Sequence, residues 1–336
     1  MKNKSRFLQI GGTLLMSVLF AACSQDEVTS QDTPLPEGKY PLEFTAYGLE
    51  AVATPAKAGT RATSDGNWSD MKYPICIAQN ENKDNIKLYT AKTTSDDKKT
   101  ATLTSNAPFW WTETAKAKSV SAWYPPLKEY DYIEHINLYP LEYRFWEIKP
   151  NQSAGIQQTT VSGYGDFLWA YETNIEWGKS TSLTFKHLTT KVIINIMESD
   201  DYLKDLSSED ISVTLKDFFT AGQFRSGGKD LYIKGITDFK SHITPHRLKL
   251  PLDKKAHTSF EALVIPQDIS GQSIEIKVNN AATYEWKLTS DTATKLEGGT
   301  VYTFNITLKA NKLTVTTTNS MTWGDGGIAS GSINLQ

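Results

Sequence analysis

Cysteine, histidine and an excess of either charge are all scarce in this sequence. Two cysteines among 336 residues, Cys23 and Cys76, exclude a disulfide framework. Five scattered histidines leave little material for a metal centre or a histidine-based active site. The 35 Lys and Arg residues against 38 Asp and Glu give a net charge of −3. Nucleic acid is therefore not expected as a partner, because phosphate binding needs a concentrated basic surface.

Sequence motifs of catalysis are also missing. The chain contains no H-E-x-x-H, G-x-S-x-G, G-x-G-x-x-G, Walker A or C-x-x-C pattern. His242 and His246 are four residues apart, but Pro245 lies between them, so no regular helix presents both to one metal. Cys76 lies in the apolar run Tyr73–Ala78, which predicts a small buried side chain rather than a nucleophile. We expect no enzyme, no metal site and no cofactor.

The one long apolar stretch stands at the start of the chain. Positive residues at Lys2, Lys4 and Arg6 are followed by apolar residues and then by small residues directly before Cys23. This order resembles a lipoprotein signal peptide over residues 1–22, with the lipid (palmitate) on Cys23. Its removal leaves 32 Lys and Arg against 38 Asp and Glu, a net charge of −6. The lipid, and not charge, would then hold the protein at the outer membrane.

The segment after the lipid site predicts a tether. Residues 23–39 are polar and contain Pro34 and Pro36, which is typical of a flexible spacer. Its first residues, Ser24–Glu27, resemble the acidic export tag that directs lipoproteins of the Bacteroidetes to the outer face of the outer membrane. We therefore expect a surface-exposed protein.

The body of the chain predicts strands. From about residue 40, apolar residues alternate with a period of two in short runs rich in Val, Ile, Thr, Tyr and Phe. Long helical patterns are nearly absent, and only 199–210 predicts a short helix or turn. With 39% hydrophobic residues for a core, the pattern favours an all-β fold of two antiparallel β-sandwiches, over residues 40–178 and 179–310.

A loop after the first predicted strand carries a single arginine. The strand Pro41–Gly48 is followed by a polar loop that contains Gly59-Thr60-Arg61-Ala62-Thr63. A long basic side chain on a backbone of small residues is what a trypsin-like protease requires. Cleavage between Arg61 and Ala62 would release the lipid together with the first strand. An ordinary solvated arginine is the alternative interpretation.

The C-terminal segment 311–336 predicts a strand that could serve a neighbouring molecule. Apolar residues recur at alternate positions, of which Leu313, Val315, Met321 and Trp323 are the candidate donor residues. A groove left by the lost first strand would expose unpaired backbone groups and apolar pockets. A strand from another subunit could fill this groove by β-augmentation, giving an open head-to-tail fibre. An ordinary last strand of the second sandwich is the alternative.

Trp110 and Trp111 are candidates for glycan contact. Adjacent residues of a strand point to opposite faces, so one of the two is expected to be exposed or to lie at a domain edge. Most of the other tryptophans lie within alternating strands, where an inward core position is the default.

The motifs, taken in order, resemble the fimbrillin family of the Bacteroidetes, the subunits of type V pili. The resemblance covers nearly the whole chain and rests on eight segments: Cys23, Thr60-Arg61-Ala62, Val120–Pro125, Asp166–Ala170, Leu183–Val192, Gly298–Phe304, Leu313–Val315 and Trp323. It implies two transthyretin-like β-sandwich domains, lipoprotein export, cleavage by an arginine-specific protease and polymerisation by strand exchange with other fimbrial subunits. In this frame Arg61 is the cleavage position, residues 40–50 the removed strand and residues 311–323 the donor segment.

Three further points accompany the resemblance. His187 is expected to satisfy a strand end, and Lys191 to be structural. Asp291-Thr292-Ala293 resembles an O-glycosylation sequon of these bacteria, with Thr292 as the acceptor. The Gly-rich tail after Trp323 is longer than expected of a major stalk subunit.

The role within the pilus stays open between stalk, tip, accessory and an uncleaved anchor subunit. A lipoprotein that binds host or bacterial glycans while it remains anchored to the surface is the other alternative.

Overall fold

The protein is built from strands. The computed structural model describes residues 33–47, 68, 73–79, 82–94, 99–124, 143–156, 165–198, 203, 205–225, 233–235, 238–269, 271–279, 282–288, 295–309, 312–322 and 331–333. The predicted all-β class is confirmed, while the transthyretin-like arrangement stays a prediction. A single-turn 3-10 helix, η2 (Ser208–Asp210), lies in the stretch where a short helix or turn was expected. Within the described ranges, no helix has both the length and the apolar character needed to span a membrane.

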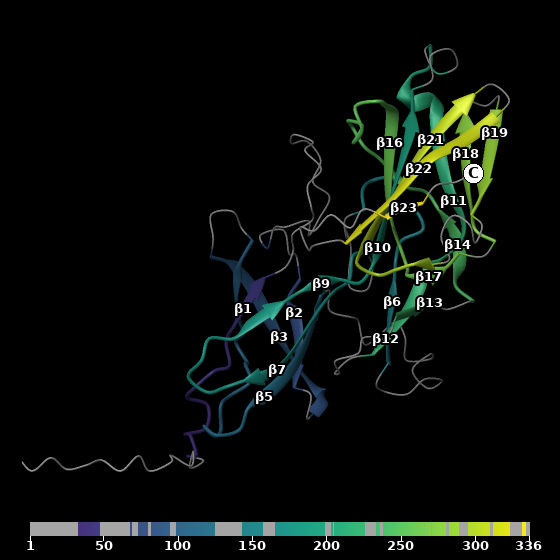
Figure 1. The fold of residues 1–336 in the computed structure, drawn as a ribbon. Coiled ribbons are helices and arrows are strands. Elements are labelled where there is room, and N and C mark those ends of the chain that lie inside the picture. Colours follow the sequence, from purple (N-terminus) through teal and green to yellow (C-terminus); the bar gives the residue numbers. More distant parts are fainter. Residues whose placement is uncertain are drawn as a thin grey trace, which may run out of the picture.

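The first body of the molecule is an eight-stranded sheet that folds into two layers (Figure 1). Its order is β8-β1-β4-β3-β2-β5-β7-β9. The strands are β1 (Phe44–Tyr47), β2 (Ile75–Gln79), β3 (Asn82–Thr93), β4 (Ala101–Thr104), β5 (Lys118–Tyr124), β7 (Leu168–Ile175), β8 (Ser182–Thr184) and β9 (Lys186–His187). The long strand β3 pairs with β2 as far as Tyr89 and with β4 from Thr90 to Thr93, so it carries the sheet from one layer to the other.

The core of the first body follows from the period-two pattern. On β4, for example, Leu103 is fully buried, whereas its neighbours Thr102 and Thr104 are not. Leu103 belongs to one apolar cluster with Ile75 of β2 and Val120 of β5. Full burial of such a side chain contributes roughly 1.5–3 kcal/mol. The alternation seen in the sequence therefore fixes which face of each strand points inward.

The second body is a sandwich of a six-stranded and a four-stranded sheet (Figure 1). The first sheet has the order β15-β16-β10-β21-β22-β23 and the second β14-β11-β18-β19. The strands of the first are β10 (Thr190–Met197), β15 (His246–Arg247), β16 (Ala256–Val264), β21 (Thr300–Lys309), β22 (Lys312–Thr322) and β23 (Gly331–Ile333). Those of the second are β11 (Ile211–Phe219), β14 (Lys240–Ile243), β18 (Ser273–Val278) and β19 (Ala282–Lys287).

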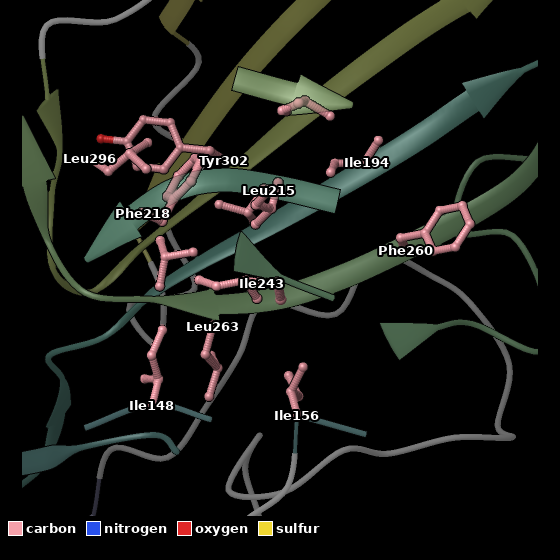
Figure 2. Packing of buried hydrophobic residues seen from close by; sticks show 14 of the residues in the cluster. Ile148, Ile156, Ile194, Leu215, Phe218, Ile243, Phe260, Leu263, Leu296 and Tyr302 are labelled. Atoms are coloured by element: carbon pink, nitrogen blue, oxygen red, sulfur yellow. The ribbon is translucent and has the colours of Figure 1, made fainter. Parts of the chain in front are cut away.

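The core of this sandwich lies between the two sheets. Figure 2 shows Ile194 of β10 and Phe260 of β16 in the same cluster as Leu215 of β11 and Ile243 of β14. All four side chains are at most 3% exposed. The antiparallel pairing of β10 with β16 and its parallel pairing with β21 place β10 inside its sheet, which explains its almost continuous run of apolar residues.

A segment from the middle of the chain crosses to the second sandwich before the first body is complete. Strand β6 (Tyr143–Glu147) joins β12 (Ala221–Arg225) and β13 (Ile233–Gly235) in a three-stranded sheet. A two-stranded ribbon of β17 (Gln267–Asp268) and β20 (Lys295–Leu296) completes the pairing. Residues 143–156 thus lie with the second sandwich, whereas β8 and β9, beyond residue 178, pair within the first sheet. The order of the strands in space differs here from their order in the sequence.

Candidate functional site

The first strand of the described chain occupies a slot between two other strands. β1 pairs antiparallel with β4, with Phe44 opposite Leu103, and parallel with β8, with Ala46 opposite Leu183. Two backbone hydrogen bonds fix the β8 side: Thr45 N–H donates to Thr181 O at 2.8 Å, and Phe185 N–H to Tyr47 O at 2.9 Å. β1 is therefore an inner strand although it stands first in the chain.

Three apolar side chains anchor this strand in the core. Leu42, Phe44 and Ala46 are 1%, 2% and 0% exposed, whereas Tyr47 is 40% exposed. The ring of Phe44 meets that of Tyr89 edge to face, with centroids 5.4 Å apart. This alternation is the pattern that a strand inserted from outside would also need.

The hydroxyl of Tyr89 links the first segment of the chain to the residues that follow β4. Its hydroxyl donates to Leu42 O at 3.1 Å and accepts from Phe109 N–H at 3.0 Å. Burial raises the pKa of Tyr89 to about 12, because the phenolate would be poorly solvated there. The group is thus a neutral hydrogen-bonding partner of the first strand at physiological pH.

The residues before β1 extend the same contact. Leu35 N–H donates to Thr112 O and Trp111 N–H donates to Tyr40 O, both at 2.9 Å. The ring of Tyr40 lies edge to face against Trp177 at 5.0 Å. Part of the segment expected to be a free tether, from residue 33 onward, therefore runs along the sandwich in this structure.

One chain segment supplies the strands at both ends of the first sheet. β8 and β9 are two halves of one extended segment that diverges at Phe185: β8 pairs with β1, and β9 pairs with β7 at the opposite end of the sheet order. Removal of β1 would leave unpaired backbone groups on both β4 and β8, which face each other across the slot.

At the other end of the chain, β22 carries the predicted donor segment. It pairs with β21 from Lys312 opposite Lys309 to Thr322 opposite Thr300. A register shift places Val315 opposite Ile306 but Thr317 opposite Asn305, so one extra residue of β22 lies between them. Strand β23 covers β22 at residues 318–320.

The predicted donor residues are therefore divided by a bulge. Leu313 and Val315 are half-buried and pack against the core of their own sandwich. Met321 lies beyond the shift, at the register position opposite Val301. The sequence pattern places these residues in one alternating row, and the pairing in this structure does not keep that row intact.

The structure places some of the other predicted site residues and not others. Trp111 is 6% exposed and contacts Trp177 edge to face at 5.7 Å, so it is a core residue. Trp110 is half-buried, which makes it the more accessible of the pair. The remaining predicted positions lie outside the described residues: Cys23, Arg61, Ala62, Thr292 and Trp323.

A buried polar cluster near the start of β10 was predicted only in part. His187 lies at the end of β9, a strand end as expected, and its Nδ1 is 2.7 Å from Asp166 Oδ2. Thr189 Oγ1 also donates to this carboxylate. Asp166 begins the segment Asp166–Ala170 that carries part of the family resemblance, but nothing in the sequence pairs it with His187, 21 residues later.

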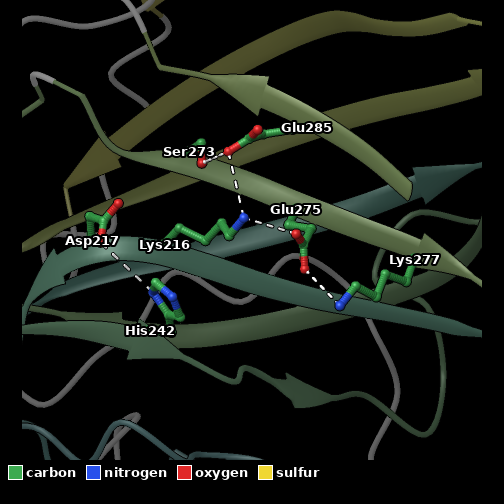
Figure 3. Close-up of polar contacts among 7 residues, drawn as sticks. All are labelled: Lys216, Asp217, His242, Ser273, Glu275, Lys277 and Glu285. Carbon is green, nitrogen blue, oxygen red and sulfur yellow. Dashed lines mark hydrogen bonds and ion pairs between the residues drawn. The ribbon is translucent and has the colours of Figure 1, made fainter.

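The outer face of the four-stranded sheet carries a ladder of charges (Figure 3). Lys216 Nζ lies 2.9 Å from Glu275 Oε2 and 3.8 Å from Glu285 Oε1, and Lys277 Nζ lies 3.1 Å from Glu275 Oε1. The hydrogen bond from Lys216 holds the pKa of Glu275 below its ordinary value. Among the described residues, no group of three or more His, Cys, Asp and Glu side chains is suited to hold a metal ion.

Several solved structures are similar to this chain in fold. A candidate cell adhesion protein from Bacteroides uniformis is 15% identical, with a TM-score of 0.56, over 86% of this chain and 100% of that one. Another from Bacteroides ovatus is 16% identical with the same TM-score, over 85% and 99%. A C-terminally truncated tip fimbrial protein, Mfa3 from Porphyromonas gingivalis, is 8% identical over 84% and 99%, with a TM-score of 0.46. The first two structures thus share the fold of this chain.

The family follows from the sequence match. The family model described as fimbrillin-like matches residues 60–323, and the chain belongs to this fimbrillin-like family. A search of curated proteins finds no significant match. Family membership indicates a fimbrial subunit or adhesin at a cell-surface appendage, associated with other fimbrial subunits and without an enzymatic role. The predicted family is therefore confirmed.

Proposed function

We propose that this protein is a fimbrial subunit, exported as a lipoprotein on Cys23, cut between Arg61 and Ala62, and polymerised by strand exchange at the β1 slot. The arrangement of β1 carries the proposal. The four-residue strand β1, with Phe44 and Ala46 deeply buried and Leu42 buried just before it, fills a gap between β4 and β8. The chain that follows it contains Arg61.

The family match supports the same division of the chain. The match begins at residue 60, so β1 lies before the matched range. The shared part, from residue 60 to residue 323, includes the predicted donor residues Leu313, Val315, Met321 and Trp323. A removable first strand and a retained last strand are what an exchange mechanism needs.

Energetics also favour a mechanism of this kind. The slot without β1 exposes two unpaired strand edges and a set of apolar pockets to water. Water can hydrate the two open edges, but the apolar pockets are buried again only when a strand fills them, so the empty slot favours binding of a strand with a suitable pattern. A strand from a second subunit restores both the pairing and the burial.

The test compares two single-residue variants in surface fibres. Arg61→Ala removes the expected cleavage position. Lys57→Ala is the matched control, because it removes a positive charge four residues earlier at a position where an arginine-specific protease does not cut. We expect wild-type and Lys57→Ala subunits to begin at Ala62 by mass spectrometry and to form fibres visible by electron microscopy. Arg61→Ala should retain the lipidated N-terminus and remain unpolymerised.

Two outcomes would contradict parts of the proposal. Fibres composed of chains that all begin at Cys23 would exclude cleavage. Wild-type chains that remain uncut in the membrane fraction, beside fibres made of other subunits, would instead identify the anchor role.

A further inference from the structure

The wall of the β1 slot depends on β1 itself for its strand pairing. Among the described strands, β8 has β1 as its one ladder partner. Hydrogen bonds to Thr181 O from Thr45 and to Tyr47 O from Phe185 join the two. Once the first strand leaves, both of these bonds are lost, and β8 has to hold its position by other means.

The same chain segment is anchored at its far end. β9 continues directly from β8 and pairs with β7, with His187 opposite Leu168. His187 Nδ1 lies 2.7 Å from Asp166 Oδ2, and Thr189 Oγ1 donates to Asp166 Oδ1. Asp166 is 4% exposed, His187 2% and Thr189 0%, so the carboxylate acts where water does not compete.

Backbone contacts hold the residues around this network. Leu188 N–H donates to Phe167 O, and Gly299 N–H donates to Thr189 O, both at 2.8 Å. Gly298 and Gly299 come so close to this segment that a Cβ at Gly299 would lie 2.8 Å from His187 O. None of these groups belongs to the first strand, so the anchor survives the loss of β1.

We propose that Asp166 is a positioning residue of the strand slot. Through His187 and Thr189 it keeps the segment 182–187 in place while the slot is empty, between departure of the first strand and entry of the next. Without this anchor, β8 is free to close on β4, because two unpaired strand edges that face each other across a gap pair readily. The inference rests on the proposed function and names the residue that keeps the slot open.

The experiment uses the full chain with a site for a sequence-specific protease placed within residues 55–61. After cleavage at that site, the first strand is held without a covalent link and exchanges with a fluorescent synthetic peptide of residues 33–47. Uptake of the peptide is followed by fluorescence anisotropy, and amide hydrogen exchange of residues 181–187 is measured on the same chain before and after cleavage.

The variants separate positioning from general stability. Asp166→Asn keeps the shape of the side chain, but its NH₂ group would face either His187 Nδ1 or Thr189 Oγ1, and both of these groups donate to the carboxylate of Asp166. Thr189→Val removes the hydroxyl at nearly constant size, and Thr189→Ser retains it as the matched control. We expect the first two variants to lose peptide uptake by about tenfold or more, the range of a buried charged hydrogen bond. Thr189→Ser should behave as wild type.

If Asp166 and Thr189 only stabilised the fold, Asp166→Asn and Thr189→Val would raise amide hydrogen exchange equally in the cut and the uncut chain. The proposal expects these variants to raise exchange at residues 181–187 in the cut chain and not in the uncut chain. Peptide uptake by Asp166→Asn and Thr189→Val at the wild-type level overturns the inference while the slot itself stands. Failure of the cut wild-type chain to exchange its first strand overturns the slot, and with it both the proposed function and this inference.

Discussion

Lys216 relieves the repulsion between two glutamates at neighbouring positions of the sheet. Glu275 stands directly opposite Glu285 in the pairing of β18 with β19, an arrangement that destabilises a sheet unless a cation lies between the two. Replacement of Lys216 by Met removes that cation (Figure 3). We expect a lower urea midpoint at neutral pH, and Lys249→Met, at an exposed position, is the control.

The pH dependence of this effect has a defined sign. The pKa of Glu275 is lowered first by the hydrogen bond from Lys216, and that of Glu285 by hydrogen bonding to Ser273 and then by the charge of Lys216. Their stabilisation is therefore present above the unfolded glutamate pKa of about 4.3 and is lost as the pH falls through the lower folded values. In Lys216→Met the acid-range change of the midpoint should be smaller. Equal profiles for Lys216→Met and Lys249→Met would contradict this.

Gly299 tests the close approach of its turn to the chain segment that joins the two sandwiches. Its φ is +70°, and an added Cβ would lie 2.8 Å from the carbonyl oxygen of His187. Gly271 has a φ of +86° but no atom within 4 Å of such a Cβ. Gly271→Ala should cost about 1–2 kcal/mol from backbone strain alone. Gly299→Ala should cost distinctly more, measured by denaturant unfolding, and equal costs would show that the turn can move away.

At the scale of single residues, the sequence predicted the strand-end position of His187 but not its hydrogen-bond partner. A histidine before a β-branched run indicates a strand end, and that is where it lies. Its partner Asp166 comes from a different strand connection, and the contact exists only because β7 and β9 pair. A sequence pattern reports on residues that are close along the chain, whereas this hydrogen bond depends on the pairing of two strands that are distant in sequence.

At the scale of the element, β1 offers a pair of variants on one strand. Phe44 is 2% exposed and packs on Tyr89, whereas Tyr47 is 40% exposed. Phe44→Ala in the uncut chain should cost about 3–5 kcal/mol, because it removes a buried ring and leaves a cavity. Tyr47→Ala should stay within about 0.5 kcal/mol of wild type. Denaturant unfolding measures both.

The same variant distinguishes the two states of the chain. If the first strand departs after cleavage, then Phe44→Ala and wild type become identical in the mature form, and their unfolding curves should coincide. A persistent difference between mature forms would mean that the strand remains bound.

The C-terminal strand shows where an element-scale prediction from periodicity ends. Alternation predicted a single row from Leu313 to Met321. The bulge beside Val315 changes the pairing parity within the run Thr316-Thr317-Thr318. Three consecutive threonines fit either face of a strand, so the sequence gives no signal for the extra residue. The register is decided by the partner strand β21 instead.

At the scale of the whole molecule, the order of segments along the chain does not predict which of the two bodies each segment joins. Short runs between turns predicted the all-β class correctly, because alternation is local. The partner of each run is not local. Residues 143–156 lie between β5 and β7 in sequence, yet they pair and pack with the second sandwich, where Figure 2 shows Ile148 and Ile156 among its core residues.

Gln152 makes this crossing specific. Its Nε2 donates to Leu263 O, and its Oε1 accepts from Leu263 N–H, both at 2.8 Å, so the side-chain amide pairs with β16 as a neighbouring strand would. Gln152 is 4% exposed. Loss of the amide would leave both backbone groups of a buried residue without a partner, at a cost of about 1–3 kcal/mol each.

The second sandwich should therefore not fold from its own part of the sequence. We expect residues 188–336 alone to lack the dispersed amide spectrum of a folded protein by NMR. The same fragment with residues 143–156 joined through a Gly/Ser linker should gain it, because the linked segment restores strand β6, the buried Ile148 and Ile156, and the amide pairing to β16. A linked segment that carries Gln152→Leu is the matched control and should give a markedly less stable fold, since leucine buries similar volume without the amide. A well-folded 188–336 fragment would contradict the expectation and would mean that the second sandwich does not need residues 143–156 to fold.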